Sequence, residues 1–293
     1  MRRSDVLRPI SLALALAAAA PADAPPRQVA RYVLAESRKV VSAAGERASA
    51  VRGAVLVVDG AARWDLGTGT FPRSSAATLI LGERGGWLVD REATVAARVA
   101  ADDVASLFVP PAEGEPGPFQ SAVRDLELAP VVSGPGPALD GRPTRRHRLE
   151  GSWVLVTSMP GRVTRIRSRL KAVVDLLEED ADAFLSPLDD PRRLLDLPPA
   201  VRAEVASVLA SLRGFPVGIL LEVESEQSTD APGMGPLPSD GGRPLKVRVE
   251  TARTVSGLEG RPPSPADAAA LRLREETRVV GVERLVEPRE TLR

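Results

Sequence analysis

The segment Leu245-Lys246-Val247-Arg248-Val249-Glu250-Thr251 alternates strictly between uncharged, mostly apolar side chains and charged ones. Successive side chains of a β-strand point to opposite faces, so this pattern predicts a strand with one buried and one solvated face. Such strands are typical of antiparallel sheets that pack on a core from one side only. Residues 217–224 repeat the pattern, with Glu222 and Glu224 on the charged face. The two segments therefore predict an antiparallel sheet.

Alternation of this kind recurs along most of the chain. It predicts further strands at Val29 to Ser42, Ala50 to Asp59, Ala76 to Leu81, Trp87 to Val89, Thr94 to Val99, Arg142 to Thr157 and Thr277 to Val286. Turn signals such as Asp59-Gly60, Gly85-Gly86 and Asp140-Gly141 lie between many of these segments. Because open sheets of many twisted strands curl or close, we expect one curved antiparallel sheet or unclosed barrel, in the mainly β (α+β) class.

Two helices are expected to interrupt the strands, in an insertion at about 166–213. Apolar residues at steps of three and four predict the first helix; they are Ile166, Leu170, Val173, Val174, Leu177, Ala181, Phe184 and Leu185. The second helix is expected to begin after Pro198-Pro199, to present Val201, Val205, Val208, Leu209 and Leu212 on one face, and to end at Gly214. An apolar helix face must be buried, so we expect the insertion to cover the concave face of the sheet.

The first 24 residues resemble an export signal. Arg2, Arg3 and Arg8 precede an apolar run from Ile10 to Ala20, and small residues follow. The run is about half of the roughly 20 residues that a membrane-spanning helix needs. We therefore expect a cleaved signal peptide at 1–24, with cleavage after Ala22 favoured, and a single domain at 25–293. The mature protein should be periplasmic or secreted, without a transmembrane anchor.

The composition narrows the possible chemistry. Lys plus Arg and Asp plus Glu number 39 each, so no net charge attracts nucleic acid, and we expect no nucleic-acid partner. There is no cysteine, which removes disulfides and thiol chemistry. The single histidine cannot build a multi-histidine metal site, and no cofactor motif is present. We expect neither metal nor cofactor.

Catalysis is not expected. His147 could join a serine and an aspartate in a triad, because triads assemble from distant segments, and this alternative stays open. However, the chain contains no G-x-S-x-G motif of the kind that presents a nucleophilic serine. We therefore expect no enzymatic activity and assign no catalytic residue.

Charge is unevenly distributed in the middle of the chain. Basic residues dominate 142–171, and acidic residues dominate 172–190. Arg145, Arg146 and Arg148 are therefore candidates for contact with an anion or a partner protein. In the alternative interpretation, the two neighbouring blocks neutralise each other on the surface. A Pro/Gly-rich stretch at 229–244 is either a functional lid or a disordered loop.

Two motifs resemble those of a known group of proteins. The segment Leu139-Asp140-Gly141-Arg142-Pro143-Thr144-Arg145-Arg146-His147-Arg148-Leu149 places a glycine turn before a strand, and Leu212-Arg213-Gly214-Phe215-Pro216-Val217 leads into the last hairpin. In these motifs and in its order of parts, the chain resembles lipoprotein-carrier-like periplasmic proteins, and more closely a related exported family of unknown function. The resemblance implies an unclosed antiparallel barrel with a helix-covered concave face. It implies no catalytic residue.

Two hypotheses for function follow. The first is that an apolar ligand, such as an acyl chain or lipid, binds between the sheet and the helices. Its expected lining is Val217, Ile219, Leu221, Val247 and Val249 from the sheet and Val173, Leu177, Val205 and Leu209 from the helices. These side chains could instead fill the space by packing against one another. The second hypothesis is a periplasmic sensing or regulatory module that contacts an envelope protein and binds no small molecule.

Overall fold

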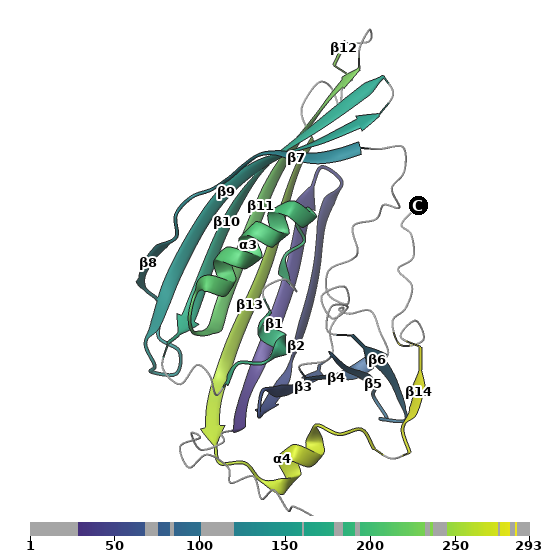
Figure 1. The fold of residues 1–293 in the computed structure, drawn as a ribbon, viewed down its shortest axis with the longest axis vertical. Helices are drawn as coiled ribbons and strands as arrows, with labels where there is room; N and C mark the ends of the chain where they lie inside the picture. Colours follow the sequence, from purple (N-terminus) through teal and green to yellow (C-terminus); the bar gives the residue numbers. More distant parts are fainter. Residues whose placement is uncertain are drawn as a thin grey trace, which may run out of the picture.

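The computed structural model describes residues 29–67, 76–82, 85–100, 120–159, 161–178, 184–190, 194–231, 235–236, 245–274, 276–281 and 285 (Figure 1). The expected signal peptide lies outside these residues. So do residues 179–183 of the acidic stretch and residues 232–234 and 237–244 of the Pro/Gly-rich stretch. No helix of the described part is long and apolar enough to cross a membrane.

One sheet dominates the fold. Its strands are β1 (Val29–Ser42), β2 (Gly45–Val58), β3 (Ala61–Leu66), β4 (Ala76–Gly82), β5 (Gly85–Asp90), β6 (Val95–Val99), β7 (Gln120–Leu128), β8 (Val132–Pro135), β9 (Thr144–Met159), β10 (Arg162–Leu177), β11 (Phe215–Ala231), β12 (Gly235–Pro236), β13 (Leu245–Arg261) and β14 (Arg278–Val280). The main path runs β14-β6-β5-β4-β3-β2-β1-β13-β11-β10-β9-β7, with β12 on β11 and β8 on β9. All pairs are antiparallel except β14 with β6. Because β14 and β7 form the two ends of this path, the sheet is unclosed, which confirms the expected fold class.

Most expected strands are present. β1 has the expected bounds, and it lies in the middle of the sheet between β2 and β13. Long-range pairing of β1 with β13, for example Val40 with Val249, joins the first strand of the described chain to a late one. β3, β7, β8 and β10 were not expected, nor was β12, which pairs with β11 within the Pro/Gly-rich stretch.

The expected helix at 166–185 is wrong over its first two thirds, because residues 162–177 form β10. Apolar residues four apart, such as Ile166, Leu170 and Val174, fit a helix, but they also share one face of a strand. Between them stand Arg167, Arg169 and Lys171, the charged half of a period-two pattern. Pairing with β9 on one side and β11 on the other stabilises the strand and decides between the two structures.

Alternation gives the sheet two different faces. We define the inner face by Leu170, Ala172 and Val174 of β10, which pair with Val223, Leu221 and Ile219 of β11. The outer face carries the intervening charged residues, among them Arg167 and Arg169.

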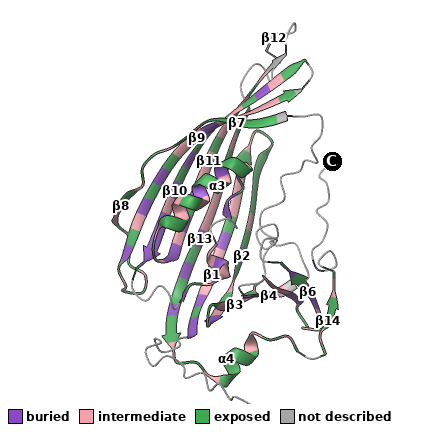
Figure 2. Ribbon diagram, viewed as in Figure 1, coloured by how far each residue is buried: buried purple, intermediate pink, exposed green. Residues whose placement is uncertain are grey.

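The chain between β10 and β11 crosses the inner face and covers it (Figures 1 and 2). This cover, residues 184–190 and 194–211, contains η1 (Pro187–Asp189) and α3 (Pro199–Ser211). α3 confirms the second expected helix, and Val201 and Val205 are its buried residues. The chain then returns to the sheet at Gly214, whose φ of +133° suits glycine. A further short helix, α4 (Pro265–Ala270), follows β13.

Two apolar clusters lie along the inner face. One contains α3 and the strands β9, β10 and β11 beneath it. The other contains residues of β1 to β6 together with Phe184 and Leu188 of the cover. In this second cluster the Phe215 ring lies 5.4 Å from Tyr32 and 5.6 Å from Phe184, measured between ring centroids. The cover is therefore anchored at one end in an aromatic core and lies at the other on an aliphatic surface.

Candidate functional site

The apolar surface beneath α3 is the candidate ligand site, and we call it the platform. Its buried members on the sheet are Leu149, Trp153, Leu170, Ala172, Val174, Leu176, Ile219 and Leu221. They are formed by successive inner-face positions of three adjacent long strands. The cover packs on them through Leu194, Leu195, Leu197, Val201 and Val205.

The interface between platform and cover is nearly filled. A pocket between Leu195, Leu197, Leu221 and Val249 has a volume of about 10 Å³, which is space for about one water molecule. Small-molecule sites usually have about 300–1,000 Å³. In this structure, with the cover on the platform, the side chains between them pack against one another and leave no ligand-sized space here, as the alternative interpretation expects.

The expected lining is only partly brought together. Ile219, Leu221, Val205 and Leu209 meet in the platform cluster. Val249 lines the small pocket beside them. Val217 and Leu177 belong instead to the aromatic cluster with Phe215.

One expected residue lies on the wrong face. Val173 alternates with the inner-face residues Ala172 and Val174 and pairs with Arg148 and Leu220, so its side chain points to the outer face. Val173 and Val174 would lie on one face of a helix, but in the strand β10 they point to opposite faces of the sheet.

Apolar inner-face residues continue along β13 from the edge of the cover. Val40, Val249 and Val223 lie side by side on β1, β13 and β11, and Val247 follows Val249 on β13 between Ser42 and Ser225; the four valines are half-buried. Leu245, the first residue of β13, is 37% exposed. We call these residues the rim. A rim of partly exposed aliphatic side chains continues the platform toward solvent.

A buried arginine attaches the cover to the sheet. Arg253 of β13 is only 1% exposed; its Nη1 donates to the Leu188 carbonyl oxygen at 2.8 Å, and its Nη2 forms an ion pair with Asp189. Burial disfavours the charge of Arg253, but the carboxylates of Asp189 and Glu36 outweigh this effect and raise its pKa. A second ion pair joins Asp196 of the cover to Arg38 of β1.

The three candidate contact arginines have different surroundings. Arg146 donates from Nε and Nη2 to the two carboxylate oxygens of buried Asp175, at 2.7 and 2.8 Å. Arg145 lies 3.6 Å from Glu178 at the surface. Arg148 is exposed and forms no ion pair within the described residues. Two of the three are thus engaged with the acidic block that follows them.

His147 is buried beside a serine. Its Nδ1 lies 2.8 Å from Ser133 Oγ. Burial, followed by the nearby charge of Arg145, lowers the pKa of His147. Among the described residues no carboxylate hydrogen-bonds to this ring, so the pair lacks the third member of a triad. The described part also contains no cluster of His, Cys, Asp or Glu that could hold a metal ion.

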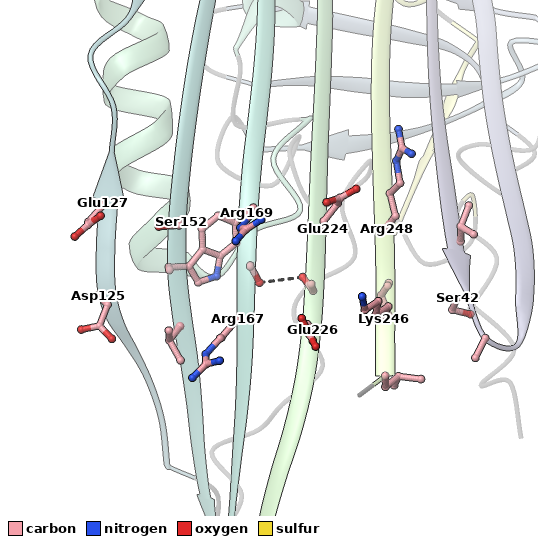
Figure 3. Close-up of a pocket in the computed structure, with 18 residues that line it drawn as sticks. Ser42, Asp125, Glu127, Ser152, Arg167, Arg169, Glu224, Glu226, Lys246 and Arg248 are labelled. Carbon is pink, nitrogen blue, oxygen red and sulfur yellow. Dashed lines mark hydrogen bonds between the residues drawn. The ribbon is translucent and has the colours of Figure 1, made fainter. Parts of the chain in front are cut away.

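A groove of about 1340 Å³, which the sequence patterns do not predict, has its charged lining on the outer face and also touches Trp153 and Val247 (Figure 3). Acidic and basic side chains line it strand by strand: Asp125 and Glu127 on β7, Arg167 and Arg169 on β10, Glu224 and Glu226 on β11, and Lys246 and Arg248 on β13. The alternating charged residues of these strands indicate a charged face. They do not indicate which strands are neighbours, so the groove could not be predicted from them.

Comparisons with known proteins give little further information. No protein-family model matches the chain, and no curated protein matches it either. Among solved structures, it is similar to a crystal structure described as an outer membrane lipoprotein-sorting protein domain, from Vibrio parahaemolyticus. The two share 9% identity, with a TM-score of 0.26, over 82% of this chain and 91% of the other. A similarity at this level assigns neither ligand nor function to the chain.

Proposed function

We propose that the chain is an exported, non-enzymatic protein that holds an apolar ligand, such as an acyl chain, against the platform. The supporting observation is the half-buried rim, because partly exposed aliphatic residues of β1, β11 and β13 lie at the edge of the platform, next to the cover. Concave apolar surfaces with few polar groups are the usual sites of apolar ligands.

The closed interface has no room for such a ligand, so the cover must move. A ligand that enters at the rim would replace the contacts of the cover with contacts of its own, and the exchange of one apolar partner for another has a small net free energy. α3 suits such an exchange. Its buried contacts are aliphatic, and it begins without a side-chain cap.

Titration with a fluorescent fatty acid tests the proposal. The protein should bind the probe saturably, and Val247→Lys, which places a charge on the rim, should weaken binding at least about tenfold, equivalent to about 1.4 kcal/mol. Leu220→Lys is the matched control, because Leu220 is an exposed aliphatic residue on the outer face. Absence of saturable binding by the unmodified protein would contradict the proposed function.

The outer-face groove supports a second candidate, an interaction module for an envelope protein. Arg167 and Arg169 form no ion pair within the described residues, although Glu226 and Glu224 lie opposite them. Free charges in a groove favour a partner of complementary charge. We expect Arg167→Ala with Arg169→Ala to abolish a salt-sensitive interaction in envelope extract. If no partner is retained at any salt concentration, this candidate fails.

A further inference from the structure

Arg253 is the only arginine among the largest fully buried side chains of the described chain. It lies on the inner face, with Ile219 of β11 on one side and Glu36 of β1 on the other. Two of its partners, the Leu188 carbonyl oxygen and the Asp189 carboxylate, belong to the cover. Its Nε has no hydrogen-bond partner within the described part. The cover thus supplies two hydrogen-bonded oxygen partners of the guanidinium, the Glu36 carboxylate of the sheet adds favourable charge, and Nε remains an unused donor.

Movement of the cover changes the surroundings of this arginine. Displacement of η1 removes the Asp189 carboxylate and the Leu188 carbonyl together. A buried guanidinium that loses two hydrogen-bonded oxygens is destabilised, because the nearby charge of Glu36 alone then offsets its desolvation. An anion that arrived with the ligand would replace these contacts, whereas a wholly apolar ligand gains nothing by displacing η1 and would displace α3 alone.

We infer that the ligand is an anionic amphiphile whose head group replaces Asp189 at Arg253. This inference rests on the proposed function and specifies the class of ligand. A carboxylate or phosphate oxygen would accept charge-assisted hydrogen bonds from Nη1 and Nη2, the donors that now serve the cover. Nε offers a further donor to the same head group.

The platform lies where the apolar tail would need it. From Arg253, the inner-face positions of β13 continue through Thr251 and Val249 to Val247 on the rim, a span of about 20 Å at about 3.3 Å per residue. Ile219 and Leu221 flank this path on β11, paired with Arg253 and Thr251. A head group at Arg253 would therefore place an extended tail along the platform toward the rim.

Asp189 thus acts as an internal competitor for the head group. Binding of an anionic ligand should be limited by the need to displace it, whereas a neutral ligand gains nothing at Arg253. The readout is the ratio of two affinities, for palmitate and for hexadecanol, which have tails of the same length. A change that merely loosens the cover affects both ligands and leaves the ratio unchanged.

The experiment compares both ligands in the unmodified chain, in Asp189→Asn and in Asp196→Asn. We expect palmitate to bind more tightly than hexadecanol by about 10- to 100-fold, the value of a charge-assisted hydrogen bond or two. Asp189→Asn should increase this ratio by about tenfold. Asp196→Asn removes a carboxylate that the cover pairs with Arg38, and it should leave the ratio unchanged.

Arg253→Gln should bring the two affinities together. If Arg253→Gln does not fold, the affinity ratio of Asp189→Asn, compared with that of the unmodified chain, tests the inference by itself. Equal binding of palmitate and hexadecanol to the unmodified chain and to Asp189→Asn would overturn the inference and leave the proposed function intact. Failure of both ligands to bind would overturn the proposed function, and the inference with it.

Discussion

Substitution of Val205 by aspartate separates a displaceable cover from a fixed core. Val205 is fully buried against the platform, and together with Val201 it forms the buried side of α3. Burial of one such side chain stabilises by about 1.5–3 kcal/mol, so the two anchor the helix with about 3–6 kcal/mol. Val205→Asp removes about half of this and adds an unpaired carboxylate, whose burial costs several kcal/mol. The helix should therefore leave the platform, which limits the loss to its docking energy.

Leu177→Asp is the matched substitution in the fixed core. Leu177 is fully buried on β10, paired with Phe215 of β11 and Thr144 of β9, and cannot leave without breaking the sheet. Loss of the leucine alone costs about 2–5 kcal/mol, and the buried carboxylate adds to this. The sum approaches the whole stability of a typical domain, about 5–15 kcal/mol.

Thermal melts followed by circular dichroism distinguish the two variants. Val205→Asp should retain a cooperative melt of the sheet, and Leu177→Asp should lose it. If binding requires the cover to move, Val205→Asp should also bind palmitate more tightly, by about tenfold for each 1.4 kcal/mol of docking energy removed. Loss of the melt in Val205→Asp would show that the cover is part of the core and would refute the reasoning.

Three further predictions concern other parts of the structure. Arg146→Ala leaves the buried Asp175 carboxylate without its bidentate partner and should destabilise by about 1–3 kcal/mol in urea unfolding; the exposed Arg148→Ala should have no measurable effect. Because the pKa of His147 is lowered in the folded state, the unfolded chain binds its proton first, so this residue should reduce stability as the pH falls through about 6.5. Urea unfolding between about pH 5 and 8 should show that drop, and His147→Gln should remove it; an unchanged pH profile in the variant would contradict the assignment. Gly214→Ala places a Cβ 2.7 Å from a backbone carbonyl oxygen at a positive φ and should lower the melting temperature by more than Gly134→Ala, where a Cβ meets nothing within 4 Å.

The sequence predicts the strands better than their partners. Alternation identifies β1 and part of β13, and it is strict in residues 245–251, where every second side chain is charged. It cannot show that these distant segments pair, since pairing depends on the whole set of strands. β10 was misread because its apolar residues fit both periods, and only its neighbours β9 and β11 resolve the ambiguity.

The sequence predicts an apolar site between the sheet and a helix, but only some of its residues. The platform residues Ile219 and Leu221 and the helix residue Val205 meet as expected, because each belongs to an unambiguous apolar pattern. Arg253 was missed, since nothing in the pattern of a strand indicates that one of its arginines is buried. The outer-face groove was missed for a related reason, as its charges come from four strands distant in sequence.

Amide hydrogen exchange of the unmodified protein, with and without saturating palmitate, tests the central claim most directly. Ligand that displaces the cover should accelerate exchange in α3, because the helix loses its contacts with the platform, while exchange in β2 and β3 should not change. Saturable binding with α3 as protected as before, or more so, would contradict displacement of the cover. In that case the ligand would have to occupy a site other than the platform.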